Sequence, residues 1–130
     1  MQKIITFLMF DGKAEEAINF YVSLFKDSRI LSITRYEAGE NGVEGTVKHA
    51  AFSLSGQEFM AIDSSVEHDF TFTPAMSLYV HCDSEQEIDE LFEKLSGEGQ
   101  VLMPLEEYPF SGRFGWVADR FGVSWQLDLE

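Results

Sequence analysis

The sequence predicts an α+β fold in which two β-α-β-β-β modules form a curled mixed sheet around a cleft. A strand-like run opens into an amphipathic helix twice, at Ile4 to Phe25 and again at Ala75 to Leu95. Three further strand-like runs follow each copy, so the chain is typical of one duplicated unit. We therefore expect a single domain, residues 1–130, made of two tandem modules that cover about 1–63 and 75–130.

Both predicted helices have one apolar side. In the first, the apolar positions recur at helical spacing; they are Ala14, Ala17, Ile18, Tyr21, Leu24 and Phe25. In the second, Ser84 and Glu87 have the spacing of a capping box, in which each side chain satisfies a backbone N–H at the helix start. The buried stripe is then Ile88, Leu91, Phe92 and Leu95. We expect Gly97 to end this helix in a left-handed conformation.

The remaining elements follow from period-2 alternation and from turn residues. The predicted strands are Ile4 to Phe10, Ile30 to Glu37, Thr46 to Leu54, Gln57 to Asp63, Ala75 to Cys82, Gly99 to Met103, Phe114 to Asp119 and Val123 to Leu129. Tight turns are expected at Ser55-Gly56 and at Arg120 to Gly122. Residues Pro104 to Arg113 read as a long loop, and we expect it to cover the cleft as a mobile lid.

The charge of the chain limits its partners. With 9 Lys and Arg against 23 Asp and Glu, the net charge is −14, which excludes nucleic acid and disfavours a membrane surface. An anionic ligand held locally by Arg35 or Arg113 stays compatible with this charge. No apolar run is long enough to cross a bilayer and nothing resembles a signal peptide, so we expect a cytoplasmic protein. The one cysteine, Cys82, alternates with apolar residues and is predicted to be a buried thiol.

Three runs carry a resemblance to a known family. They are Phe10 to Ala17, Gly56 to Asp63 and Gly115 to Gln126, the last with the pattern Gly-Trp-x-x-Asp-x-Phe-Gly-Val-Ser-Trp-Gln. In these runs the chain resembles the PhnB-like family, also called 3-demethylubiquinone-9 3-methyltransferase-like. That family belongs to the vicinal oxygen chelate superfamily, with glyoxalase I, extradiol dioxygenases and bleomycin-resistance proteins. The resemblance covers nearly the whole chain and implies paired modules around a cleft, often in a homodimer.

The resemblance also implies where a metal would be held in relatives, on the first and last strands of each module. The equivalent positions here are Thr6, Met60, Ser77 and Gln126, and none is His, Asp or Glu. Because a divalent metal site needs imidazole, thiolate or carboxylate donors, we expect no metal and no cofactor. Glu58 shares a strand face with Met60. His49, His81 and Glu58 would form a two-histidine, one-carboxylate set only if they converge, which their spacing leaves open.

The cleft is instead predicted to bind a small organic molecule. Hydrogen-bonding and apolar side chains are expected on its inner face, with Phe110 as a further apolar wall and Trp125 in the core. The predicted ligand-binding residues are Thr6, Leu8, His49, Met60, Ser77, Tyr79, Trp116 and Gln126.

Two other functions stay open beside ligand binding. One is a lyase, isomerase or dioxygenase type of enzyme, either metal-dependent or metal-free with His49 or His81 as general base. The other is the methyltransferase of the family's alternative name. It is disfavoured because a methyl donor usually sits against a glycine-rich turn after a first strand, and Asp11-Gly12-Lys13 offers one glycine.

Overall fold

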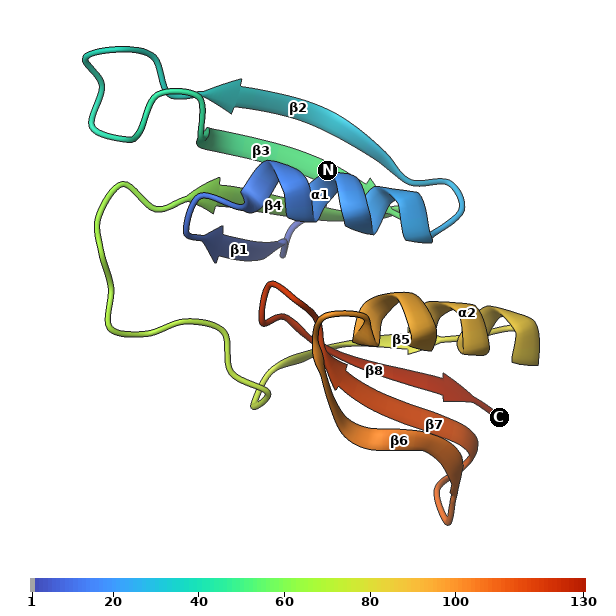
Figure 1. Ribbon diagram of the computed structural model, residues 1–130. Coiled ribbons are helices and arrows are strands. Elements are labelled where there is room, and N and C mark those ends of the chain that lie inside the picture. Colours follow the sequence, from blue (N-terminus) through green and yellow to red (C-terminus); the bar gives the residue numbers. More distant parts are fainter. Residues whose placement is uncertain (1) are drawn as a thin grey trace. The chain divides into compact units, whose positions relative to one another are not determined.

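The structure is a computed structural model that describes residues 2–130 and contains two compact units, the first ending at Asp69 and the second beginning at Phe70. Each unit has the order strand, helix, three strands (Figure 1). The first unit contains β1 (Thr6–Phe10), α1 (Ala14–Leu24), β2 (Arg29–Arg35), β3 (Val47–Leu54) and β4 (Gln57–Asp63). The second contains β5 (Ser77–His81), α2 (Glu85–Ser96), β6 (Gln100–Tyr108), β7 (Ser111–Ala118) and β8 (Ser124–Leu129). The predicted α+β class and the duplicated order are confirmed.

Each unit forms one mixed four-stranded sheet. The strand orders are β1-β4-β3-β2 and β5-β8-β7-β6. In both, the first strand pairs in parallel with the last, and the other pairs are antiparallel. Helix α1 packs against β3, β2 and β4, and helix α2 packs against β7, β8 and β6. Each sheet therefore has one helix-covered face and one face without a helix from its own unit (Figure 1).

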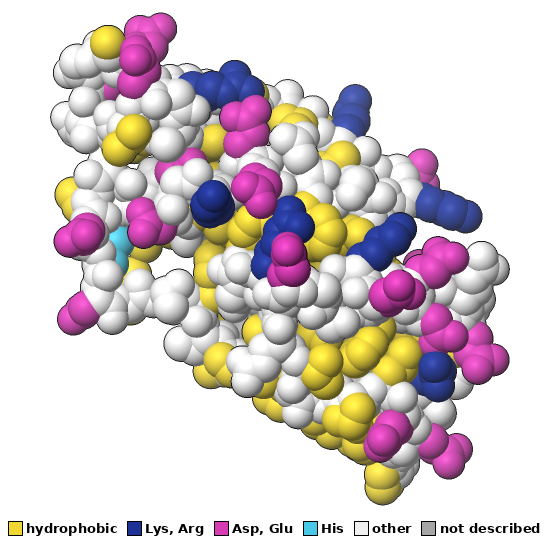
Figure 2. Space-filling view, viewed as in Figure 1, with side chains coloured by type: hydrophobic (Ala, Val, Ile, Leu, Met, Phe, Trp, Pro, Cys, Tyr) yellow, Lys and Arg dark blue, Asp and Glu magenta, His cyan; other side chains and the backbone are white. Residues whose placement is uncertain are grey.

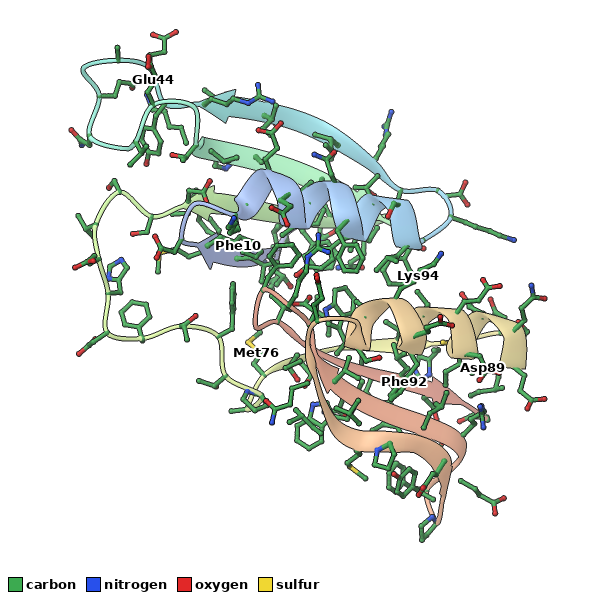
Figure 3. All side chains as sticks on the ribbon, viewed as in Figure 1. Phe10, Glu44, Met76, Asp89, Phe92 and Lys94 are labelled. Carbon is green, nitrogen blue, oxygen red and sulfur yellow. The ribbon has the colours of Figure 1, made fainter. Side chains whose placement is uncertain are left out.

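The helix-covered faces hold the two cores. In the first unit, Phe52 and Phe59 stack at 5.3 Å between ring centroids on neighbouring strands, beneath the fully buried Ile18 and Tyr21. In the second unit, α2 presents Ile88, Leu91 and Leu95, and Phe92 extends from the helix toward the sheet (Figure 3). Most of the predicted apolar stripes are buried, whereas Leu24, Phe25 and Phe92 are half-buried. Trp125 is 2% exposed and belongs to the core, as predicted.

Helix α1 is capped from a distant strand. Lys13 makes no side-chain capping bond. Instead the buried carboxylate of Asp63, at the end of β4, accepts the N–H of Ala14 at 3.0 Å and the N–H of Val47 at 2.9 Å. Because backbone donors at a helix start need partners, this carboxylate satisfies one of them and ties α1 to β3 and β4.

Helix α2 begins with the predicted cap and ends differently from the prediction. The Ser84 hydroxyl accepts the N–H of Glu87 at 3.1 Å, while the Glu87 carboxylate accepts the N–H of Asp83 at 2.6 Å rather than that of Ser84. Gly97 has φ −60°, so the prediction of a left-handed glycine is wrong. The Gly97 N–H still bonds to Glu93 at 3.2 Å, and the chain turns one residue later, at Glu98 with φ 60°.

Residues Pro104 to Arg113 form strands, so the prediction of a mobile loop is wrong. All but Pro109 and Phe110 belong to β6 or β7, which pair as an antiparallel hairpin. Met103 pairs with Trp116 and Glu106 with Phe114, which leaves one extra residue on β6 near Pro104. A proline has no N–H for a sheet, but an edge strand with a bulge accommodates one, and β6 is an edge strand. The other strands end within two residues of the predicted limits.

Candidate functional site

The helix-free face of the second sheet presents a regular grid of side chains. On adjacent β5, β8 and β7, residues directly opposite one another share a face, and alternate residues along a strand share it too. The middle row is Tyr79, Gln126 and Trp116. The full grid consists of Ser77, Ser124 and Ala118, then Tyr79, Gln126 and Trp116, then His81, Asp128 and Phe114. All four binding residues predicted for this module therefore lie on one face.

Hydrogen bonds join four polar side chains of the grid into a chain. The indole N–H of Trp116 donates to Ser124 Oγ at 2.8 Å. Ser124 Oγ lies 2.7 Å from Ser77 Oγ, and Gln126 Nε2 donates to Ser77 Oγ at 3.1 Å. These bonds fix the orientation of Gln126 between the two aromatic side chains of its row. Ser124 was not among the predicted site residues, although its alternation with Gln126 and Asp128 on β8 is a signal that places it on their face.

A carboxylate and a histidine occupy the next row. Asp128 is 5% exposed; one of its oxygens accepts the Ser111 hydroxyl, and the other lies 3.4 Å from His81 Nδ1. The His81 side chain is largely exposed, so its second ring nitrogen is accessible. The Asp128 carboxylate thus lies on the Nδ1 side of the His81 ring. Asp128 was also missed by sequence reasoning.

Aromatic rings border this row. Phe114 contacts Phe110 at 4.9 Å, Tyr108 at 5.8 Å and Tyr79 at 6.4 Å between ring centroids. Phe110, predicted as an apolar wall, thus lies beside the grid at the tip of the β6–β7 hairpin. Burial, together with the negative charges of Asp128 and Glu130, raises the pKa of the Tyr79 phenol, which keeps it a neutral hydrogen-bonding group.

The nine grid positions hold no Lys or Arg. Both arginines considered as anion holders are paired with helix carboxylates. Arg35 donates twice to Glu15, at 2.9 and 2.6 Å, and Arg113 donates twice to Asp89, also at 2.9 and 2.6 Å. On the face shown in Figure 2, Lys and Arg side chains are interspersed with Asp and Glu rather than gathered in one basic patch. Neither arginine is therefore an unpaired anion-binding group.

The predicted site residues of the first sheet lie on opposite faces. Met60 and His49 lie on the helix-free face, where the His49 ring contacts Phe7 edge-on at 6.3 Å. Thr6 pairs with the buried Phe59, and Leu8 with the buried Ala61, so both lie on the helix-covered face. The placement of Thr6 and Leu8 beside Met60 was wrong by one residue. A shift of one residue moves every side chain of a strand to the other face, and Phe7 occupies the place expected for Thr6.

The donors of the first sheet do not fit a metal site. Ser53 pairs with Glu58, and His49 is four residues farther along β3. At about 3.3 Å per residue, His49 and Glu58 are separated by about 13 Å along the strands, too far to bind one ion. Across residues 2–130, no three His, Cys, Asp or Glu side chains are grouped as a metal site would require.

The relatives of the chain agree with this fold. The sequence model of the 3-demethylubiquinone-9 3-methyltransferase family matches residues 2–128. The chain belongs to this family. The PhnB protein of Bacillus cereus is 65% identical to it, with a TM-score of 0.98 over 99% of this chain and 100% of that one. Escherichia coli YjdN is 22% identical over 95% of this chain and 92% of its own length.

More distant solved structures share only the fold. The fosfomycin resistance protein FosX of Listeria monocytogenes superposes with a TM-score of 0.66 at 11% identity, over 100% of this chain and 93% of that one. FosX belongs to the vicinal oxygen chelate superfamily, so this PhnB-like chain has the glyoxalase/bleomycin-resistance type of fold. In the part of the chain that the structure describes, no helix has the length and apolar character needed to span a membrane.

Proposed function

We propose that the chain binds a small organic molecule on the helix-free face of the second sheet. The observation that carries the proposal is the middle row of the grid, where Gln126 stands between Tyr79 and Trp116 and is hydrogen-bonded to Ser77. Half-exposed aromatic rings beside oriented polar groups are typical of small-molecule sites. The 65% identity with the PhnB protein of Bacillus cereus agrees with membership of the family.

The two tryptophans provide the test. Trp125 is buried and Trp116 is half-exposed, so a Trp125→Phe variant reports on Trp116 alone. Native mass spectrometry of the purified protein would identify a molecule that co-purifies. Adding that molecule back to stripped protein should change Trp116 fluorescence saturably, and a Gln126→Leu variant should weaken this change. A ligand that binds without affecting Trp116, and equally well to the Gln126 variant, would reject this site.

We also propose that the chain forms a homodimer, as edge strands in both sheets remain unpaired within each unit. Light scattering after gel filtration should then give a mass twice the 14.8 kDa of one chain.

We propose further that the two units form one domain. A single cooperative unfolding transition, seen by both fluorescence and circular dichroism, would support this proposal. Two separate transitions would contradict the single domain.

A metal-free enzyme is the second candidate, favoured by one observation. The Asp128 carboxylate lies 3.4 Å from His81 Nδ1, an arrangement that orients the other ring nitrogen outward as a proton acceptor. If this dyad catalyses a reaction, an Asp128→Asn variant would retain ligand binding and lose turnover.

The methyltransferase of the family description is disfavoured, because Gly12 is the one glycine after β1, where a methyl donor usually sits against a glycine-rich turn. Titration with S-adenosylmethionine tests it directly, and saturable binding would favour it.

A further inference from the structure

The hydrogen atoms of the Trp116–Ser124–Ser77–Gln126 chain have a defined direction. Ser124 is 2% exposed, so its hydroxyl hydrogen needs an acceptor inside the unit. Trp116 already donates to Ser124, and the oxygen beside it is Ser77 Oγ at 2.7 Å. Ser124 therefore donates to Ser77.

This direction leaves the Ser77 hydroxyl hydrogen, the second amide hydrogen of Gln126 and the Gln126 Oε1 atom for a ligand. Ser77 Oγ accepts from both Ser124 and Gln126, which occupies its two lone pairs and leaves its own hydrogen to donate. The Gln126 Oε1 atom receives no hydrogen bond from another described residue, and the side chain is half-exposed. A donor and an acceptor therefore lie side by side, joined by a 3.1 Å hydrogen bond between their side chains.

The charges around this pair disfavour an anion. No grid position carries Lys or Arg, and Arg113 is committed to Asp89. The nearest charged group along β8 is the Asp128 carboxylate, two residues from Gln126. A carboxylate ligand would lose its hydration and find only neutral donors, the Ser77 hydroxyl and the second Gln126 amide hydrogen, beside the Gln126 amide oxygen and the negative charge of Asp128.

From these observations, and resting on the proposed function, we propose that the site takes neutral planar aromatic amides or lactams. The ligand carbonyl accepts from the Ser77 hydroxyl, and the ligand N–H donates to Gln126 Oε1. The ring lies against the half-exposed Tyr79 and Trp116, which stand on either side of Gln126. The amide group of such a ligand carries an N–H donor and a carbonyl acceptor at one edge, and these complement Gln126 Oε1 and the Ser77 hydroxyl.

Three probes with one ring separate the alternatives: benzamide, benzoate and protonated benzylamine. The full-length protein carries two indole N–H groups, and each gives its own NMR signal, assigned with Trp116→Phe and Trp125→Phe variants. Benzamide should shift the Trp116 signal saturably. The Trp125 signal should stay unchanged, because the indole N–H of Trp125 donates to the Asp119 carboxylate at 2.8 Å. We expect benzoate and benzylamine to bind at least about ten-fold more weakly.

Two variants test the donor and the acceptor. Ser77→Ala and Gln126→Leu should each weaken benzamide binding about ten-fold, the effect of losing one hydrogen bond. Ser53→Ala, a half-exposed serine of the first sheet, is the matched control and should bind normally. Circular dichroism and a melting curve establish that each variant is folded.

The results distinguish the ligand class from the site itself. If benzoate or benzylamine shifts Trp116 as tightly as benzamide does, or if Ser77→Ala leaves benzamide affinity unchanged, the amide class is wrong and the aromatic site stands. If none of the probes shifts Trp116 while a co-purifying molecule does, the class is likewise wrong. If that molecule shifts neither indole, the site and the class both fail.

Discussion

A Cβ atom placed on Gly115 would lie 2.7 Å from the ring of Phe92. Gly115 on β7 is buried directly beneath α2, so the helix approaches the sheet as closely as it does because no side chain intervenes. Figure 3 shows Phe92 on the side of α2 toward the strands.

A Gly115→Ala substitution should therefore destabilise the protein. The added methyl group must displace the Phe92 ring or the helix, and overpacking of this kind costs about 1–3 kcal/mol. Urea unfolding measures the change in the free energy of unfolding. A second substitution, Phe92→Leu, should restore part of the loss in the Gly115→Ala background.

Gly112→Ala is the matched control on the same strand. There a Cβ atom would come no closer than 3.4 Å to another atom. We expect its free energy of unfolding to stay within about 0.5 kcal/mol of that of the parent protein. Equal losses for both glycine variants would contradict the role of Phe92.

An Asp63→Asn substitution should also destabilise the protein. One amide oxygen replaces two carboxylate oxygens, so either the Ala14 or the Val47 N–H faces an NH₂ group instead of an acceptor. An unsatisfied buried donor costs about 1–3 kcal/mol. Thermal or urea unfolding checks this, with exposed Asp11→Asn as the control. If the Asp63→Asn variant is as stable as its parent, α1 needs no such cap.

Cys82 should be unreactive in the folded protein. Burial, with a further contribution from Glu87, raises the pKa of its thiol to about 12, and the nucleophilic form is the thiolate. At pH 8, a disulfide reagent such as Ellman's reagent should label the native protein slowly and the urea-unfolded protein at once. Rapid labelling of the native protein would contradict the burial of this side chain.

The same thiol should lower stability in alkali. The folded thiol keeps its proton up to about pH 12, whereas the unfolded thiol loses it near its ordinary pKa. The unfolded state then binds fewer protons, so stability falls as pH rises from about 9 to 12. A Cys82→Ala variant should show a smaller slope of unfolding free energy against pH in this window. Parallel slopes for the two proteins would contradict this assignment.

The two tryptophans should differ in acrylamide quenching. Trp125 is 2% exposed and Trp116 is half-exposed. The Trp125→Phe variant, which retains Trp116, should be quenched several-fold more efficiently than Trp116→Phe. Both should be quenched equally in urea. Equal quenching in the native state would place Trp116 in the core.

Local patterns predicted most of the fold. The period of the apolar residues determined α1 and α2, and the Ser84 cap followed from two residues three apart. The hairpin from β6 to β7 was missed because Pro104, Pro109 and Gly112 are loop-forming residues by composition. Only pairing with β7 shows that Pro104 stands at a bulge on an edge. The cap of α1 was equally inaccessible, since Asp63 is 49 residues from Ala14.

The predicted grouping of side chains on one face holds in the second unit and fails in the first. Ser77, Tyr79, Trp116 and Gln126 share a face because the registers of β5, β7 and β8 follow their alternation. Thr6 and Leu8 were placed wrongly because β1 was aligned with β5 by counting back from the helices. Thr6 and Ser77 each stand eight residues before the start of the following helix, but Phe7, one residue later than Thr6, is the residue that lies on the helix-free face as Ser77 does. A difference of one residue is enough to exchange the faces.

The bulged outer strand of the second sheet has a further consequence for the behaviour of the chain in concentrated solution. A strand from another molecule that added to this sheet along β6 would lack an N–H partner at Pro104. The extra residue there also disturbs the spacing of the neighbouring backbone N–H and C=O groups. Fibril-like growth from this border is therefore opposed by the backbone itself, whatever the side chains are.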